Sequence, residues 1–91
     1  MSAAIYLDVD DEITTAVARI RSATGSPVLL VVPWGSRLAS SRINFRLLAR
    51  EAVAQGRELV VVAPEPAARS LATSAGLATH AERGLVTAGR T

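Results

Sequence analysis

Arginine and serine side chains gather in one short segment of the sequence, residues 33–42. The candidate anion-binding residues in it are Ser36, Arg37, Ser40, Ser41 and Arg42. Hydroxyl and guanidinium groups just ahead of a helix suit a phosphate, because a helix N-terminus presents free N–H groups and partial positive charge. The segment fits neither G-x-x-x-x-G-K-[ST] nor G-x-G-x-x-G, so no nucleotide-binding motif supports the site. The alternative interpretation makes Ser40 or Ser41 a helix N-cap and Trp34 a partly exposed packing residue.

Four carboxylates stand close together in residues 8–12. Asp8, Asp10 and Asp11 are weak candidates for a Mg²⁺ site, since this ion prefers carboxylate oxygens. The preferred interpretation is capping of an expected helix: Asp10 or Asp11 can accept hydrogen bonds from its free N–H groups, and Glu12 meets the positive end of its dipole favourably. We therefore predict no metal at this position.

Catalytic groups of other kinds are scarce in the sequence. There is no cysteine, and His80 is the single histidine, with no convincing acid or base near it in sequence. A nucleophile needs an adjacent base, and this chain offers no such arrangement. We expect a protein without catalytic residues and without a cofactor.

Arg42, the last residue of this segment, begins a series of arginines at helical spacing. Arg42, Arg46 and Arg50 stand four apart in a helix expected over residues 40–55 and form one ridge. Apolar residues lie on both sides of this ridge: Phe45, Leu48, Ala49 and Ala52 are expected to face the sheet, and Ile43, Leu47 and Ala54 form a second strip. Either the second strip meets another protein or subunit, or Ile43 and Leu47 pack under the loop of residues 33–40. The candidate interaction residues are Trp34, Ile43, Arg46, Leu47 and Arg50.

Charge and composition exclude several classes of protein. The net charge is +2, all ten basic residues are arginine, and aromatic residues make up 3% of the chain. Nucleic acid is not an expected partner, because three arginines beside Glu51, without interleaved aromatic residues, make a small electrostatic footprint. No apolar run reaches the roughly 18 residues of a membrane-spanning helix.

Alternating apolar patterns predict the elements that carry these residues. Strands are expected over residues 4–9, 28–32, 59–63 and 77–81. Helices are expected from Ile13 to a point before Gly25, and over residues 40–55 and 66–75. This alternation predicts an α/β domain of about four parallel strands with three helices, joined by right-handed crossovers.

Two of these strands, 28–32 and 59–63, are apolar throughout, which is typical of strands covered on both faces. We therefore expect a small three-layer α/β/α domain, Rossmann-like or flavodoxin-like, with strand order 3-2-1-4 or 2-1-3-4. The domain is expected over residues 4–81, followed by a flexible tail or linker over residues 82–91.

Residues 5–13, 41–52 and 71–77, in their order and spacing, resemble the N-terminal cytoplasmic Rossmann-like domain of bacterial membrane proteins known as baseplate J-like. The resemblance implies a cytoplasmic domain of a longer chain that carries a downstream membrane segment and a region similar to phage-tail or injection-system baseplates. It brings no catalytic residues with it. We expect a non-enzymatic interaction or assembly domain of a larger envelope-associated protein, with a protein partner or self-association. The alternative is a phosphate- or nucleotide-binding sensor that uses the loop after the second strand.

Overall fold

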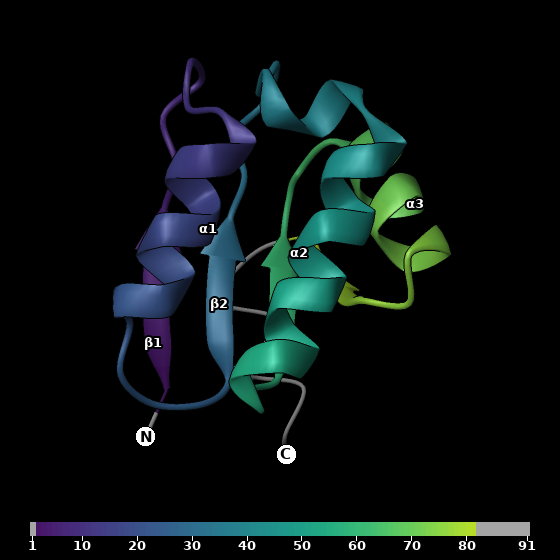
Figure 1. The fold of residues 1–91 in the computed structure, drawn as a ribbon. Helices are drawn as coiled ribbons and strands as arrows, with labels where there is room; N and C mark the ends of the chain where they lie inside the picture. The colour runs from purple at the N-terminus through teal and green to yellow at the C-terminus, as the bar shows by residue number, and fades with distance from the viewer. Residues whose placement is uncertain (1, 82–91) are drawn as a thin grey trace.

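Four parallel strands and three α-helices alternate along the chain in the computed structural model, which describes residues 2–81 (Figure 1). The strands are β1 (Ala3–Tyr6), β2 (Val28–Val31), β3 (Leu59–Val62) and β4 (Ala78–His80). The helices are α1 (Ile13–Ser22), α2 (Arg42–Gln55) and α3 (Pro66–Ser74), and a short 3₁₀ helix, Leu38–Ser40, precedes α2. The predicted α/β class, with four parallel strands and three helices, is confirmed.

The strands lie in the order β1-β2-β3-β4, so every crossover steps to the next strand in the same direction. A right-handed crossover places its helix on a face that depends on the direction of the step, and steps in one direction place all helices on one face. Accordingly, α1, α2 and α3 lie side by side over the same face of the sheet (Figure 1). The helix layer therefore has a continuous outer surface, and α2 lies at its centre.

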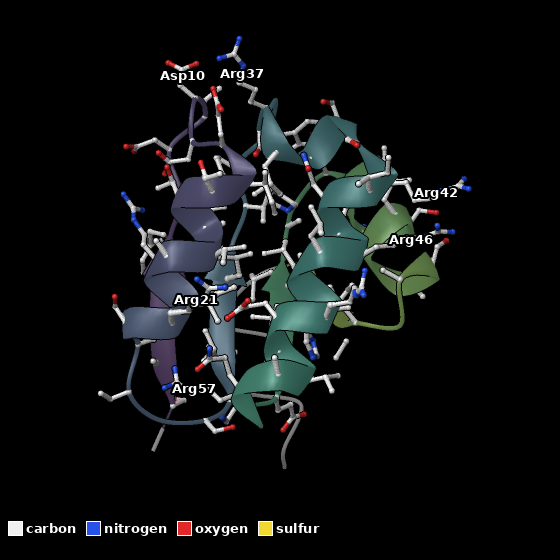
Figure 2. All side chains as sticks on the ribbon, in the orientation of Figure 1. Asp10, Arg21, Arg37, Arg42, Arg46 and Arg57 are labelled. Atoms are coloured by element: carbon white, nitrogen blue, oxygen red, sulfur yellow. The ribbon has the colours of Figure 1, made fainter. Side chains whose placement is uncertain are left out.

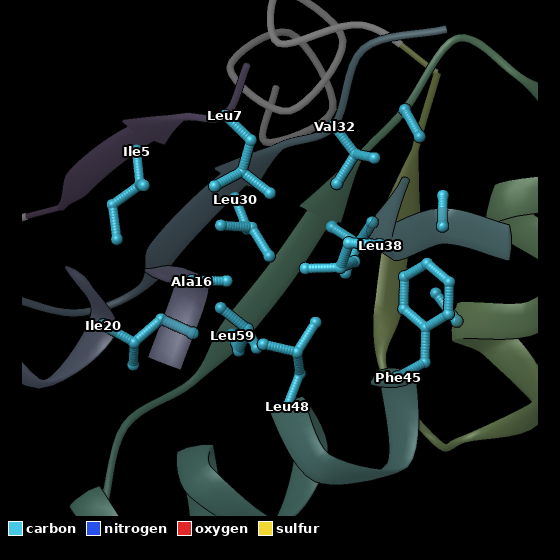
Figure 3. Packing of buried hydrophobic residues seen from close by; sticks show 14 of the residues in the cluster. Ile5, Leu7, Ala16, Ile20, Leu30, Val32, Leu38, Phe45, Leu48 and Leu59 are labelled. Atoms are coloured by element: carbon cyan, nitrogen blue, oxygen red, sulfur yellow. The ribbon is translucent and has the colours of Figure 1, made fainter. Parts of the chain in front are cut away.

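The main core fills the space between the sheet and this helix layer. Figure 3 shows Ile5 and Leu30 of the sheet facing Ala16, Leu48 and Phe45 of the helices. In each strand, every second side chain points into this core from the sheet. In each helix, side chains three to four residues apart point into it from the helix layer. Phe45 and Leu48 are fully buried, which sets the rotation of α2 about its own axis.

The predicted strand orders, 3-2-1-4 and 2-1-3-4, are wrong, and so is the expectation of helices on both faces for the part of the chain that the structure describes. The second face of the sheet carries an apolar cluster of Leu29, Val60 and Val62, with Val31 packed against it. None of the helices within residues 2–81 lies over this cluster. Apolar residues on both faces of a strand show that both faces avoid water, but they do not identify what covers each face.

Glycine and proline mark the ends of two helices. Gly56 ends α2 in the left-handed conformation, with φ +65°, and the next N–H, of Arg57, donates to the carbonyl of Ala52 at 3.0 Å. Pro66 begins α3 at its first position, as expected of a residue that lacks an N–H. The predicted tail, residues 82–91, lies outside the described residues. No helix within residues 2–81 is long and apolar enough to cross a membrane.

Candidate functional site

The loop between β2 and α2 is held in place by backbone contacts to its neighbours. The N–H of Arg37 donates to the carbonyl of Val9 at 2.9 Å, which joins this loop to the loop between β1 and α1. The N–H of Gly35 donates to Oε1 of Glu65 at 3.2 Å, just before α3. A carboxylate of the protein itself therefore occupies the position that an anion would take at Gly35.

The five candidate anion-binding residues do not converge on one point. Ser36 is buried, and its Oγ has no hydrogen-bond partner within the described residues. The guanidinium of Arg37 lies 3.6 Å from Glu12, and the Oγ of Ser40 donates to the carbonyl of Arg37 at 2.8 Å. Figure 2 shows Arg37 beside Asp10 at one end of the molecule, whereas Arg42 projects on the far side of α2.

One of the two predicted N-cap serines lies at the N-cap position, but it does not make the expected hydrogen bond. Ser41 occupies the N-cap of α2 in an extended conformation, but its side chain makes no capping hydrogen bond. The amide of Asn44 is used nearby, because its Nδ2 donates to the carbonyl of Leu38 at 2.9 Å and fixes the 3₁₀ turn against α2. The entrance to α2 is therefore a rigid junction in which Ser41 supplies backbone geometry only.

The acidic segment before α1 closes a turn instead of capping the helix. Oδ2 of Asp11 accepts a hydrogen bond from the N–H of Asp8 at 2.8 Å and lies 3.3 Å from Nη1 of Arg19. Glu12 is the N-cap residue of α1, and its side chain makes no capping bond. The predicted capping is wrong for Asp11, because its carboxylate accepts from the N–H of Asp8 and not from α1. Within residues 2–81, no three His, Cys, Asp or Glu side chains form a group that could hold a metal ion.

The outer face of α2 is the most distinctive surface of the molecule. Ile43, Leu47 and Val53 remain 64%, 40% and 82% exposed, although all three are aliphatic. The alternative in which Ile43 and Leu47 pack under the loop of residues 33–40 is therefore wrong. Val53 was not among the predicted contact residues; the signal for it is its position seven residues after Arg46, two helical turns along the ridge. Trp34, a predicted contact residue on the loop after β2, is 61% exposed.

A groove of about 620 Å³ runs between α1 and α2 next to this exposed strip. Its apolar lining includes Val17 and Ala18 of α1 and Leu47 and Ala54 of α2. The groove is open to solvent and lies between two helices that pack on each other. Small and aliphatic side chains thus line a hollow in the surface of the helix layer.

An ion pair spans the groove and fixes α1 against α2. Nε of Arg21 lies 2.9 Å from Oε2 of Glu51, and Nη2 lies 3.2 Å from Oε1, so the contact is bidentate (Figure 2 labels Arg21). Nε2 of Gln55 also donates to Oε2 of Glu51 at 2.8 Å. Hydrogen bonds from Arg21 and then from Gln55 lower the pKa of Glu51, because they stabilise its ionised form.

Most arginines within residues 2–81 have an internal partner. Nη1 of Arg57 donates to the carbonyl of Ile20 at 2.9 Å, at the end of α1, and Nη1 of Arg69 donates to the carbonyls of Ala63 and Pro64. Arg19, Arg21 and Arg37 form the ion pairs described above. The arginines that make no hydrogen bond or ion pair within the described residues are the three of the ridge: Arg42, Arg46 and Arg50.

A larger hollow, of about 820 Å³, lies along the free edge of β1 beside α1. Its lining consists mainly of alanine, threonine and serine side chains, and Arg19 is its single charged residue. Arg19 already donates to the carbonyl of Tyr6 at 3.0 Å and pairs with Asp11. This hollow is large but offers few groups for specific recognition, so the outer face of α2 is the stronger candidate site.

Comparison of the chain with protein-family models, with curated proteins and with solved structures finds no match.

Proposed function

We propose that this chain is a non-enzymatic interaction domain that binds another protein through the outer face of its helix layer. We call this region the α2 contact surface. It consists of the groove between α1 and α2 together with six exposed residues of α2: Arg42, Ile43, Arg46, Leu47, Arg50 and Val53.

One observation carries the proposal: the aliphatic residues that remain exposed on α2 stand beside arginines without internal partners. Val53, near the C-terminal end of α2, is 82% exposed, so its side chain contributes little to the packing of the domain. A cluster of apolar residues rimmed by charged residues is typical of a protein–protein contact, in which the apolar part is buried and the charges set specificity.

The setting of this interaction follows from the resemblance to baseplate J-like proteins. We propose a cytoplasmic assembly domain of a larger envelope-associated protein, because the resembling segments include 41–52, which supply most of α2. In such a protein the α2 contact surface would join this domain to another component of the assembly.

Site-specific photo-crosslinking in the native host tests the proposal. A photoreactive residue replaces Val53 or, in a second variant, Leu47, and a matched control carries it at Thr24, which is exposed on the other side of α1. We expect a discrete crosslinked protein from positions 53 and 47 but not from position 24. Equal crosslinking from all three positions, or none from any, would refute the proposed contact surface.

The phosphate- or nucleotide-sensing alternative is supported by one feature, the buried Oγ of Ser36 without a partner among the described residues. Against it, Glu65 accepts a hydrogen bond from the N–H of Gly35, and the carboxylate of Glu12 lies 3.6 Å from the guanidinium of Arg37. A ligand present at 100 times its Kd stabilises a protein by about 2.7 kcal/mol, which a thermal melt detects easily. We expect no rise in Tm with millimolar phosphate, ATP or NAD. A reproducible rise would support the sensing function instead of the interaction domain.

A further inference from the structure

We infer that the partner segment is an acidic amphipathic helix that lies in the groove between α1 and α2. This inference rests on the proposed function and specifies the chemistry of its partner. Three properties of the α2 contact surface lead to it: its uncompensated charge, its shape and the distribution of its apolar side chains.

The charge of the surface selects an acidic partner. Arg42, Arg46 and Arg50 have no partner within the described residues, whereas the carboxylate in the groove, Glu51, is held by Arg21 and Gln55. Three positive charges along α2 therefore remain without a counter-charge in this part of the chain. Carboxylates on a docked segment would provide it, and complementary charges at the edge of a contact raise the association rate and fix the register.

The same charges argue against a second copy of this chain as the partner. A symmetric dimer places the same surface of both copies face to face. The ridge of arginines would then meet itself, and Glu51 is already engaged by Arg21. Like charges brought together across an interface cost several kcal/mol, so self-association through this surface is disfavoured.

The shape of the surface selects a helix. The groove lies between two helices of the same layer, and its lining by Val17, Ala18, Leu47 and Ala54 leaves space for aliphatic side chains. An amphipathic helix presents such side chains at i, i+3, i+4 and i+7 and docks by placing them in a groove of this kind. Arg50 itself lines the groove, whereas Arg42 and Arg46 project from the side of α2 that is turned away from α1 (Figure 2). A helix in the groove would therefore place carboxylates at Arg50 and, across the outer face of α2, at the arginines one and two turns before it.

Exposure along α2 distinguishes this groove from a lipid-binding face. Leu47 is 40% exposed and lines the groove, while Ile43 and Val53 are 64% and 82% exposed. Side chains of a partner helix can contact residues at both depths. A membrane surface would contact the most exposed residues and leave the groove unfilled, so we assign the surface to a protein segment.

Selection from a peptide library tests the inference directly, because it lets the surface itself choose among peptides of every charge. A phage-displayed library of random 16-residue peptides is selected for binding to the full 91-residue chain. We expect the enriched peptides to be net acidic, with apolar residues at helical spacing. Addition of an enriched peptide should shift the amide NMR signals of residues that line the groove, Ala18 and Leu47 among them.

Charge reversal provides the matched comparison. The triple variant R42E/R46E/R50E should weaken binding of the enriched peptides about 10- to 100-fold, since exposed charge pairs each contribute a few-fold and reversal turns attraction into repulsion. The variant should stay folded, because these exposed side chains make no hydrogen bond or ion pair within the described residues. The control, R37E, changes an exposed arginine that does not line the groove and should leave peptide affinity within about two-fold, since solvent and salt screen exposed charges at a distance.

Three results would overturn the inference: enrichment of neutral or basic peptides, affinity unaffected by the triple reversal, or peptide-induced shifts confined to residues outside the groove. Flotation with vesicles of phosphatidylglycerol and phosphatidylcholine is run in parallel. Binding to these vesicles that is lost in R42E/R46E/R50E, with no peptide enriched, would assign the surface to anionic lipid instead. Failure of the acidic-helix inference is distinguishable from failure of the proposed function, because photo-crosslinking at position 53 detects a protein partner of any charge.

Discussion

Leu47 and Leu48 are neighbours on α2 that differ sharply in burial, and alanine substitutions at the two positions test the orientation of the helix. Leu48 is fully buried, whereas Leu47 is 40% exposed at the edge of the groove. The two variants lose the same side-chain atoms and gain the same helix propensity. The difference between them therefore reports burial alone.

The expected loss of stability differs by at least a factor of two. L48A removes a buried side chain from beneath the helix layer and leaves a cavity, which costs about 2 to 5 kcal/mol. L47A removes partial burial only, and water fills the space, so about 1 kcal/mol is expected from the roughly 1.5–3 kcal/mol of a fully buried leucine. A domain of this size has a free energy of unfolding of about 5 to 14 kcal/mol, so L48A should be a large perturbation.

Urea unfolding followed by far-UV circular dichroism measures both values, with an unchanged m-value as the check that each variant unfolds from the same compact state. Equal losses for L47A and L48A would show that α2 does not direct Leu47 outward, and the α2 contact surface would then have no structural basis. A larger loss for L47A than for L48A would refute the rotation of α2 outright.

Other substitutions test individual contacts. G56A should cost about 1 to 2 kcal/mol, because a Cβ at Gly56 meets no atom within 4 Å and the cost comes only from its left-handed φ; a change within error in urea unfolding would contradict this. R69M should cost about 1 kcal/mol through loss of the hydrogen bonds to the carbonyls of Ala63 and Pro64, and a thermal melt at neutral pH is the measurement. The pKa of Glu51 is lowered in the folded state, so its contribution to stability is present above its ordinary value of 4.5 and is lost as the pH falls through the lowered folded value. Wild type should therefore lose stability relative to E51Q on acidification below pH about 4.5, and parallel pH profiles would contradict the assignment.

Much of the fold was predictable because its signals are local. The aliphatic runs that became β2 and β3 lie between turn residues, and glycines with positive φ, Gly56 and Gly76, directly follow the last turns of α2 and α3. The arginine ridge was also predictable, since a spacing of four residues places side chains on one face of any α-helix. None of these features depends on which strand lies next to which.

Several features of the candidate site could not be read from the sequence. Arg21 meets Glu51, and Gly35 meets Glu65, across 30 residues in each case. These pairings follow from the packing of α1 on α2 and from the position of α3. The spacing of the residues in the sequence therefore does not predict them. They decide which charged groups are already engaged and which remain for a partner.

The sequence by itself determined the α/β class, the order of elements along the chain, and the presence of two apolar strips beside a ridge of arginines on one helix. Tertiary structure alone decided the strand order β1-β2-β3-β4, the single helix layer within residues 2–81, and the exposure of Ile43, Leu47 and Val53. The physical reason is that a run of apolar residues encodes the need to avoid water, but not the neighbour that excludes it. That neighbour is set by the direction of each crossover, which here places α2 at the centre of an open surface and leaves its three arginines without a partner among the described residues.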